Sequence, residues 1–96
     1  MGNIGRRIRP IRESMDLGRS AFAKTLGVKK QLIISIEHAK QRPTEEVLDG
    51  IGREWPRFAY WLLTGKSRIE FNDVDPDIEK AQRGAETRPE ENRNGE

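Results

Sequence analysis

Residues 19–37 read RSAFAKTLGVKKQLIISIE, and the pattern of this stretch decides the fold. Apolar residues recur at helical spacing on both sides of Gly27, so the stretch predicts two short helices. Glycine readily adopts the left-handed conformation that ends a helix, which places a tight turn between them. Two helices locked at a fixed angle by a shared apolar face form a helix-turn-helix. The residues expected on the shared face are Phe22, Ala23, Leu26, Val28, Ile33 and Ile36.

Three further helices are expected around this unit. The first would run over residues 4–14, with Asn3 as its N-cap and Pro10 in its interior. Because an interior proline removes a backbone hydrogen bond, we expect a kink at Pro10; the alternative is a regular helix that starts only there. Thr44 would cap a fourth helix, and Pro56 would open a fifth. The chain is therefore predicted to be all-α.

The pattern changes after the fifth helix. Ile69 and Phe71 alternate with polar residues, which predicts a very short strand, and residues 76–81 predict one or two helical turns. From about Gln82 almost nothing apolar is available for burial, so we expect disorder there. The chain is thus predicted to divide into a helix-turn-helix domain over residues 1–66, an extension over residues 67–81 and a disordered acidic tail over residues 82–96.

The charge is distributed unevenly along the chain. Residues 1–66 hold 13 Lys and Arg against 7 Asp and Glu, whereas residues 67–96 hold 5 against 9, and together these give the net charge of +2. A basic domain followed by an acidic segment is typical of a protein that binds a polyanion through its basic part.

Residue types that enzymes and metal sites use are sparse. The chain has no cysteine and His38 is its single histidine, so we predict no metal site, no cofactor and no enzyme. No apolar run approaches the length of a membrane span and the N-terminus lacks a signal-peptide pattern, so we expect a cytoplasmic protein without a membrane partner.

The aromatic residues around the fifth helix suit a core, or a core with a dimer contact, better than a base-stacking platform. These residues are Trp55, Phe58, Tyr60 and Trp61.

The order of these features resembles the Xre/Cro family of phage and bacterial repressors. The pattern that carries the resemblance consists of residues 22–31 (FAKTLGVKKQ), Ile33, Ile36, Glu37, Pro43, Thr44 and the closing residues 58–66. The resemblance covers residues 4–66 and implies a five-helix, lambda-repressor-like DNA-binding domain. Two departures stand out. Gly18 replaces the Ser or Thr that often caps the second helix, and Ala39 replaces a common glycine after the third.

The resemblance also implies which residues contact DNA. The second helix of the pair would enter the major groove, where lysine donates to guanine O6 and N7 and glutamine pairs with adenine N6 and N7. The implied base-reading residues are Lys30, Gln31 and Ser35, with Leu32 and Ile34 as apolar candidates for a thymine methyl group. Alternatively, Leu32 tucks beside the first or fourth helix, or both apolar residues bind a protein partner. The implied phosphate contacts are Arg19, Lys29, Lys40, Arg42 and, as a weaker candidate, Arg6.

We therefore expect a sequence-specific DNA-binding regulator, chiefly a repressor, that binds double-stranded DNA with two half-sites as a homodimer. The predicted dimer interface consists of Trp61, Ile69, Phe71, Val74 and Ile78. The alternative is that the extension folds back on its own domain. Two other functions stay open. One is an Xre-type antitoxin that regulates its own operon and binds a toxin through its tail, and the other is a protein-interaction module with a degenerate helix-turn-helix.

Overall fold

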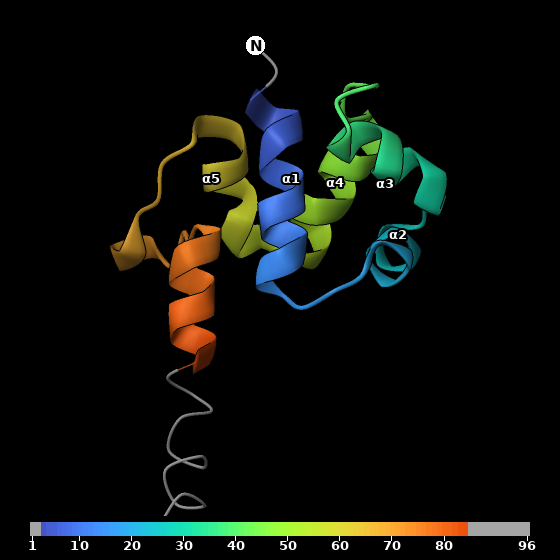
Figure 1. Cartoon of the computed structure of the whole chain (residues 1–96). Helices are drawn as coiled ribbons and strands as arrows, with labels where there is room; N and C mark the ends of the chain where they lie inside the picture. The colour runs from blue at the N-terminus through green and yellow to red at the C-terminus, as the bar shows by residue number, and fades with distance from the viewer. Residues whose placement is uncertain (1–2, 85–96) are drawn as a thin grey trace, which may run out of the picture.

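The computed structural model of the chain describes residues 3–84, which are mostly helical (Figure 1). Its elements in chain order are α1 (Asn3–Ser14), α2 (Arg19–Leu26), α3 (Lys30–Glu37), α4 (Glu45–Glu54), the 3-10 turn η1 (Pro56–Phe58), α5 (Ala59–Thr64), the 3-10 turn η2 (Ile69–Phe71) and a last helix over residues 76–84. No sheet forms in this part of the chain. The all-α prediction is therefore confirmed for the described residues, and residues 85–96 of the predicted tail lie outside them.

The first helix, α1, runs through Pro10 without a break. Its apolar residues Ile8 and Ile11 are fully buried. The alternative in which the regular helix starts at Pro10 is therefore wrong, because burial of this face offsets the roughly 3 kcal/mol that an interior proline costs. The N-cap prediction for Asn3 is also corrected, since the helix already includes this residue. The kink at Pro10 stays a prediction.

Three helices end in the same hydrogen-bonded turn. After α2, the amides of Gly27 and Val28 donate to carbonyls of the last helical turn at 3.1 and 3.0 Å, and Gly27 has φ 76°. This is a Schellman motif, in which a left-handed residue lets the chain satisfy the last carbonyls of a helix. Asp16 after α1 and Ala39 after α3 close equivalent turns with φ 59° and 61°. The tight turn predicted at Gly27 is confirmed.

The core takes one face from each helix. Phe22 is fully buried, and its ring stacks on that of Trp55 with centroids 5.4 Å apart. Helices α2 and α4 approach so closely that a Cβ on Gly50 would lie 2.7 Å from a methyl carbon of Leu26. Any larger residue at position 50 would force the side chain of Leu26 to shift, so Gly50 favours this close packing although glycine weakens a helix. The residues predicted for the shared face of the helix-turn-helix all belong to this core or pack against it, namely Phe22, Ala23, Leu26, Val28, Ile33 and Ile36.

The extension folds back on the helical domain. Val74 is fully buried in the core, and its amide donates to the carbonyl of Arg57 at 2.9 Å. The prediction of Val74 as a dimer contact is therefore wrong, and the alternative is correct for this residue. In the last helix the buried Glu79 accepts hydrogen bonds from the guanidinium of Arg57 at 2.8 and 3.0 Å and from Arg83 at 2.7 Å. These contacts hold the last helix against η1.

Two local predictions for the extension are also corrected. Ile69 and Phe71 lie in the 3-10 turn η2 and not in a strand, because Asn72 has φ 61° and reverses the chain before a strand extends. The last helix reaches residue 84, so disorder does not begin at Gln82. The hydrogen bond from Arg83 to the buried carboxylate of the same helix gives a physical reason for this added turn.

Candidate nucleic-acid interface

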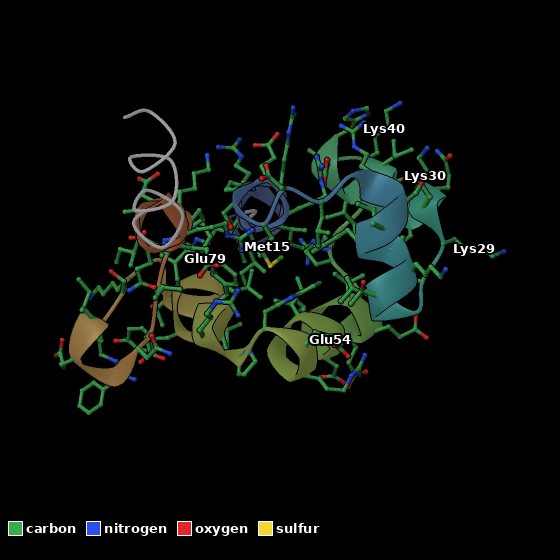
Figure 2. The ribbon with its side chains drawn as sticks, turned by 90° about the horizontal axis from the view of Figure 1, so that it is seen from below. Met15, Lys29, Lys30, Lys40, Glu54 and Glu79 are labelled. Atoms are coloured by element: carbon green, nitrogen blue, oxygen red, sulfur yellow. The ribbon has the colours of Figure 1, made fainter. Side chains whose placement is uncertain are left out.

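Helix α3 buries one face and exposes the other. Ile33 and Ile36 lie in the core, whereas Lys29, Lys30 and Gln31 at the N-terminal end are exposed. Figure 2 shows Lys29 and Lys30 projecting from the end of the molecule that α2 and α3 form. The N-terminus of a helix carries partial positive charge, and the two lysines add to it. This end of α3 therefore attracts anions and is open to a partner.

The other predicted base-reading residues are less accessible. Leu32 is half-buried and packs against the core, as in the alternative that places it beside a neighbouring helix. Ile34 and Ser35 are also half-buried and keep part of their surface open. Lys30 and Gln31 are therefore the most exposed of the predicted base-reading residues.

A buried ion cluster ties α1, α2 and α3 together. Glu37, the last residue of α3, has a fully buried side chain. Arg12 of α1 donates to its carboxylate through Nε at 2.7 Å and through Nη2 at 3.1 Å, and Arg19 of α2 donates through Nε at 2.9 Å. Arg12 also donates to the carbonyl of Leu17 at 2.8 Å. Because the three helices meet at one carboxylate, the cluster fixes the orientation of α3 against its neighbours.

The carboxylate of Glu37 stays charged despite its burial. Burial alone raises the pKa of this group, since it disfavours the charged form. Hydrogen bonds from Arg12 and then from Arg19, together with the charges of both arginines, lower the pKa of Glu37 below its ordinary value. The cluster is therefore ionised at neutral pH.

This cluster gives Arg19 a structural role that was not predicted. Its Nε donates to Glu37, so Arg19 helps to position α2 and α3. Its side chain is still 30% exposed, and the phosphate contact stays a prediction. The sequence did contain a signal for the cluster, because Arg12 lies four residues after Ile8 on the buried face of α1. A buried cation requires an acidic partner.

The remaining predicted phosphate contacts are exposed cations. They are Arg6, Lys29, Lys40 and Arg42, and within residues 3–84 none of them forms an ion pair with an acidic side chain. Lys29 precedes α3, whereas Lys40 and Arg42 follow it in the loop to α4. Figure 2 shows Lys40 at the same end of the molecule as Lys30. Cations thus lie beyond both ends of α3, where they can fix its register on a polyanion.

The loop that carries Lys40 and Arg42 begins with an unfavourable backbone conformation. Ala39 has φ 61°, and its amide and that of Lys40 close the turn after α3 at 3.1 and 2.9 Å. A left-handed conformation brings the Cβ of alanine too close to the backbone, a contact that glycine lacks. The departure from glycine at this position therefore leaves strain in the loop.

Exchanging residue types at two equivalent turns is expected to change stability in opposite directions. Ala39→Gly should raise the free energy of unfolding by about 0.5–1 kcal/mol. The strain energy that the glycine relieves in the folded state is larger than the stabilisation that its flexibility gives to the unfolded chain. Gly27→Ala should lower it by about 1 kcal/mol, because Gly27 has φ 76° and no atom within 4 Å of its Cβ position. Denaturant unfolding of both variants checks this, and shifts of the same sign would contradict it.

Comparison of the chain with known protein families, with curated proteins and with solved structures returns no match. The described residues contain no group of three or more His, Cys, Asp or Glu side chains arranged to hold a metal ion. Between residues 3 and 84 no helix is both long and apolar enough to cross a membrane. The geometry of α3 and the charges around it are therefore the basis for a functional proposal.

Proposed function

We propose that the chain is a sequence-specific DNA-binding regulator of transcription that acts as a repressor by occupying its operator. The proposal rests on how α3 is held, with one side buried and its N-terminal end exposed. Ile33, Ile36 and the Glu37 cluster fix its inner side, while Lys30 and Gln31 are exposed at its N-terminal end. In a helix-turn-helix the first residues of the second helix face base edges in the major groove. In this proposal the helices form a five-helix, lambda-repressor-like domain that works in the cytoplasm and has no catalytic role.

The proposed contacts divide into two kinds. Gln31 pairs with adenine and Lys30 donates to guanine, so these two residues read the sequence. Lys29, Lys40 and Arg42 contact phosphates, which fixes the position of α3 without reading bases. This division predicts different consequences for substitutions of the two kinds.

The experiment that tests the function selects a binding site from a random DNA library and then compares two variants on it. Gln31→Ala is expected to cost about 1–3 kcal/mol on the selected site and to relax the preference for one base pair. Arg42→Ala is expected to weaken binding to selected and random DNA alike and to reduce the salt slope by about one. Fluorescence anisotropy measures both effects. Equal losses for Gln31→Ala on selected and random DNA would contradict base reading.

An operator with two half-sites requires a homodimer. In the described part of the chain the exposed large apolar side chains are Leu63, Ile69 and Phe71, which are between 60% and 65% exposed. They lie in α5 and η2, and Figure 1 shows η2 at the end of the molecule remote from α3. Trp61 and Ile78 are half-buried and pack against the core. The proposed dimer surface is therefore centred on Ile69 and Phe71, with Leu63 added to the predicted set.

Introducing charge into this surface is expected to separate the dimer. The double variant Ile69→Lys with Phe71→Lys should sediment as a monomer, because two apolar contacts are replaced by like charges. It should keep its helical content, since both side chains are exposed in the single chain. Analytical ultracentrifugation and circular dichroism check the two expectations. A parent protein that is itself a monomer would refute the dimer and leave this surface free for a different protein partner.

A further inference from the structure

A hollow lies between α1 and the loop from α3 to α4. Its volume is about 290 Å³, close to the lower end of the range of about 300–1,000 Å³ for ligand pockets. Gly5 and Arg6 of α1 form one wall, and Ile36 and Glu37 with the loop residues 39–43 form the rest. Figure 1 shows the N-terminal end of α1 and this loop at the same end of the molecule.

The lining combines a positive rim with apolar walls. Arg6, Lys40 and Arg42 supply three exposed cations that have no ion pair among residues 3–84. The one acidic residue of the lining, Glu37, is already bonded to two arginines, so it does not cancel these charges. Guanidinium and ammonium groups are the side chains that bind phosphate oxygens. Apolar surface, including that of Pro43, remains for a ring.

Gly5 and Pro43 face each other across the hollow. A Cβ on Gly5 would lie in ordinary contact with ring carbons of Pro43, at 3.5 and 3.6 Å, so the further atoms of a longer side chain would occupy the hollow. A DNA phosphodiester bound by Lys40 and Arg42 would engage the rim and would have no apolar group to place against the walls. A free ligand with both a phosphate and a flat apolar group fits the rim and the walls together.

We infer that this hollow binds a small aromatic phosphate ester, and that this ligand competes with DNA for Lys40 and Arg42. The binding site stands on the geometry of the hollow alone. The competition rests on the proposed DNA-binding function and would make the hollow a regulatory site of the regulator.

Binding is tested on the full chain by NMR titration with phenyl phosphate, and with inorganic phosphate as the probe that lacks a ring. Phenyl phosphate is expected to shift the amides of residues 5, 6 and 36–42 and to bind about tenfold more tightly, which corresponds to about 1.4 kcal/mol for the buried ring. Equal affinities for the two probes, or shifts spread over all surface lysines and arginines, would overturn the site.

Two glycine substitutions distinguish binding in the hollow from binding elsewhere on the surface. Gly5→Leu is expected to reduce the affinity for phenyl phosphate about tenfold, to that of inorganic phosphate, because the ring loses its place. Gly52→Leu is the matched control, since Gly52 lies in α4 and a Cβ there meets nothing within 4 Å. Arg6→Gln keeps the helix and removes one rim charge, so it should weaken both probes. Unchanged phenyl phosphate binding in Gly5→Leu and Arg6→Gln would overturn the inference.

Competition is measured by DNA anisotropy at constant ionic strength. At a phenyl phosphate concentration ten times its dissociation constant, the DNA affinity is expected to fall about tenfold, and Gly5→Leu should remove this effect. If the chain binds DNA and phenyl phosphate has no more effect than inorganic phosphate, the competition is refuted while the proposed function stands. If the chain binds no DNA, the proposed function and the competition both fail, and the NMR result still decides the site.

Discussion

Replacing Glu37 with glutamine is expected to lower the free energy of unfolding by about 3 kcal/mol, because it leaves the buried guanidinium of Arg12 without a counter-charge. The side chain of Arg12 is 9% exposed, so water cannot replace the lost carboxylate. Arg19 is 30% exposed and can turn toward solvent. The loss in free energy of unfolding is therefore expected at the lower end of the range for broken buried ion pairs. Guanidinium denaturation followed by circular dichroism measures the change.

Glu13→Gln is the matched control for this substitution. Glu13 also bonds an arginine, Arg9, at 2.9 Å, but both side chains are about half exposed and the pair lies within one helix. Exposed pairs of this kind contribute at most about 0.5 kcal/mol. A loss in Glu37→Gln no larger than that in Glu13→Gln would show that the cluster does not hold the three helices together.

The stability difference between the parent and Glu37→Gln should depend on pH. The pKa of Glu37 is lowered in the folded state, so its contribution is fully present above its ordinary value of about 4.5 and is lost as pH falls through the lower folded value. Hydrogen bonds from Arg57, opposed by burial and assisted by Arg83, also lower the pKa of Glu79. Because both proteins contain Glu79, its effect cancels in the difference, which should be constant from neutral pH to about pH 5 and shrink below it.

The helices and their inner faces were predictable from sequence because their spacing is local. Ile33 and Ile36 share a face of α3, and their burial leaves Lys30 and Gln31 outside, so the accessible end of the candidate site follows from periodicity. The turn at Gly27 followed from the residue type in the same way. Each of these features depends on residues that lie within one or two helical turns of each other.

The rest depends on contacts between residues far apart in the chain. Arg12 and Glu37 are 25 residues apart, and no spacing rule links them, so the cluster that they form with Arg19 was not predicted. The alternation of apolar and polar residues around Ile69 did not show that Ile69 and Phe71 are exposed whereas Val74 is buried. Val74 is held in the core by long-range contacts. Its amide donates to the carbonyl of Arg57, and Glu79 of the last helix accepts hydrogen bonds from the guanidinium of the same arginine. These pairings exist only once the fold brings the segments together.

Removing three of the cations that flank α3 is expected to weaken binding to the selected DNA site on the order of a hundredfold at about 150 mM salt. The triple variant replaces Lys29, Lys40 and Arg42 with glutamine, and all three side chains are exposed. If each contacts one phosphate, the slope of log affinity against log salt falls by about 2.7. Because this loss reflects counterion release, the affinities of parent and variant should converge as the salt concentration approaches about 1 M. Anisotropy titrations over a series of salt concentrations give both quantities.

A second triple variant distinguishes local contacts from the net charge of the chain. Arg53, Lys66 and Lys80 are exposed cations at the end of α4, after α5 and in the last helix, and their replacement by glutamine changes the net charge by the same amount. If DNA lies along α3, the salt slope of this variant should match that of the parent, because phosphate contacts act over little more than a Debye length. If the slope of log affinity against log salt falls by the same amount in both triple variants, DNA is held by diffuse attraction to a basic chain. The assignment of α3 to the major groove is then wrong.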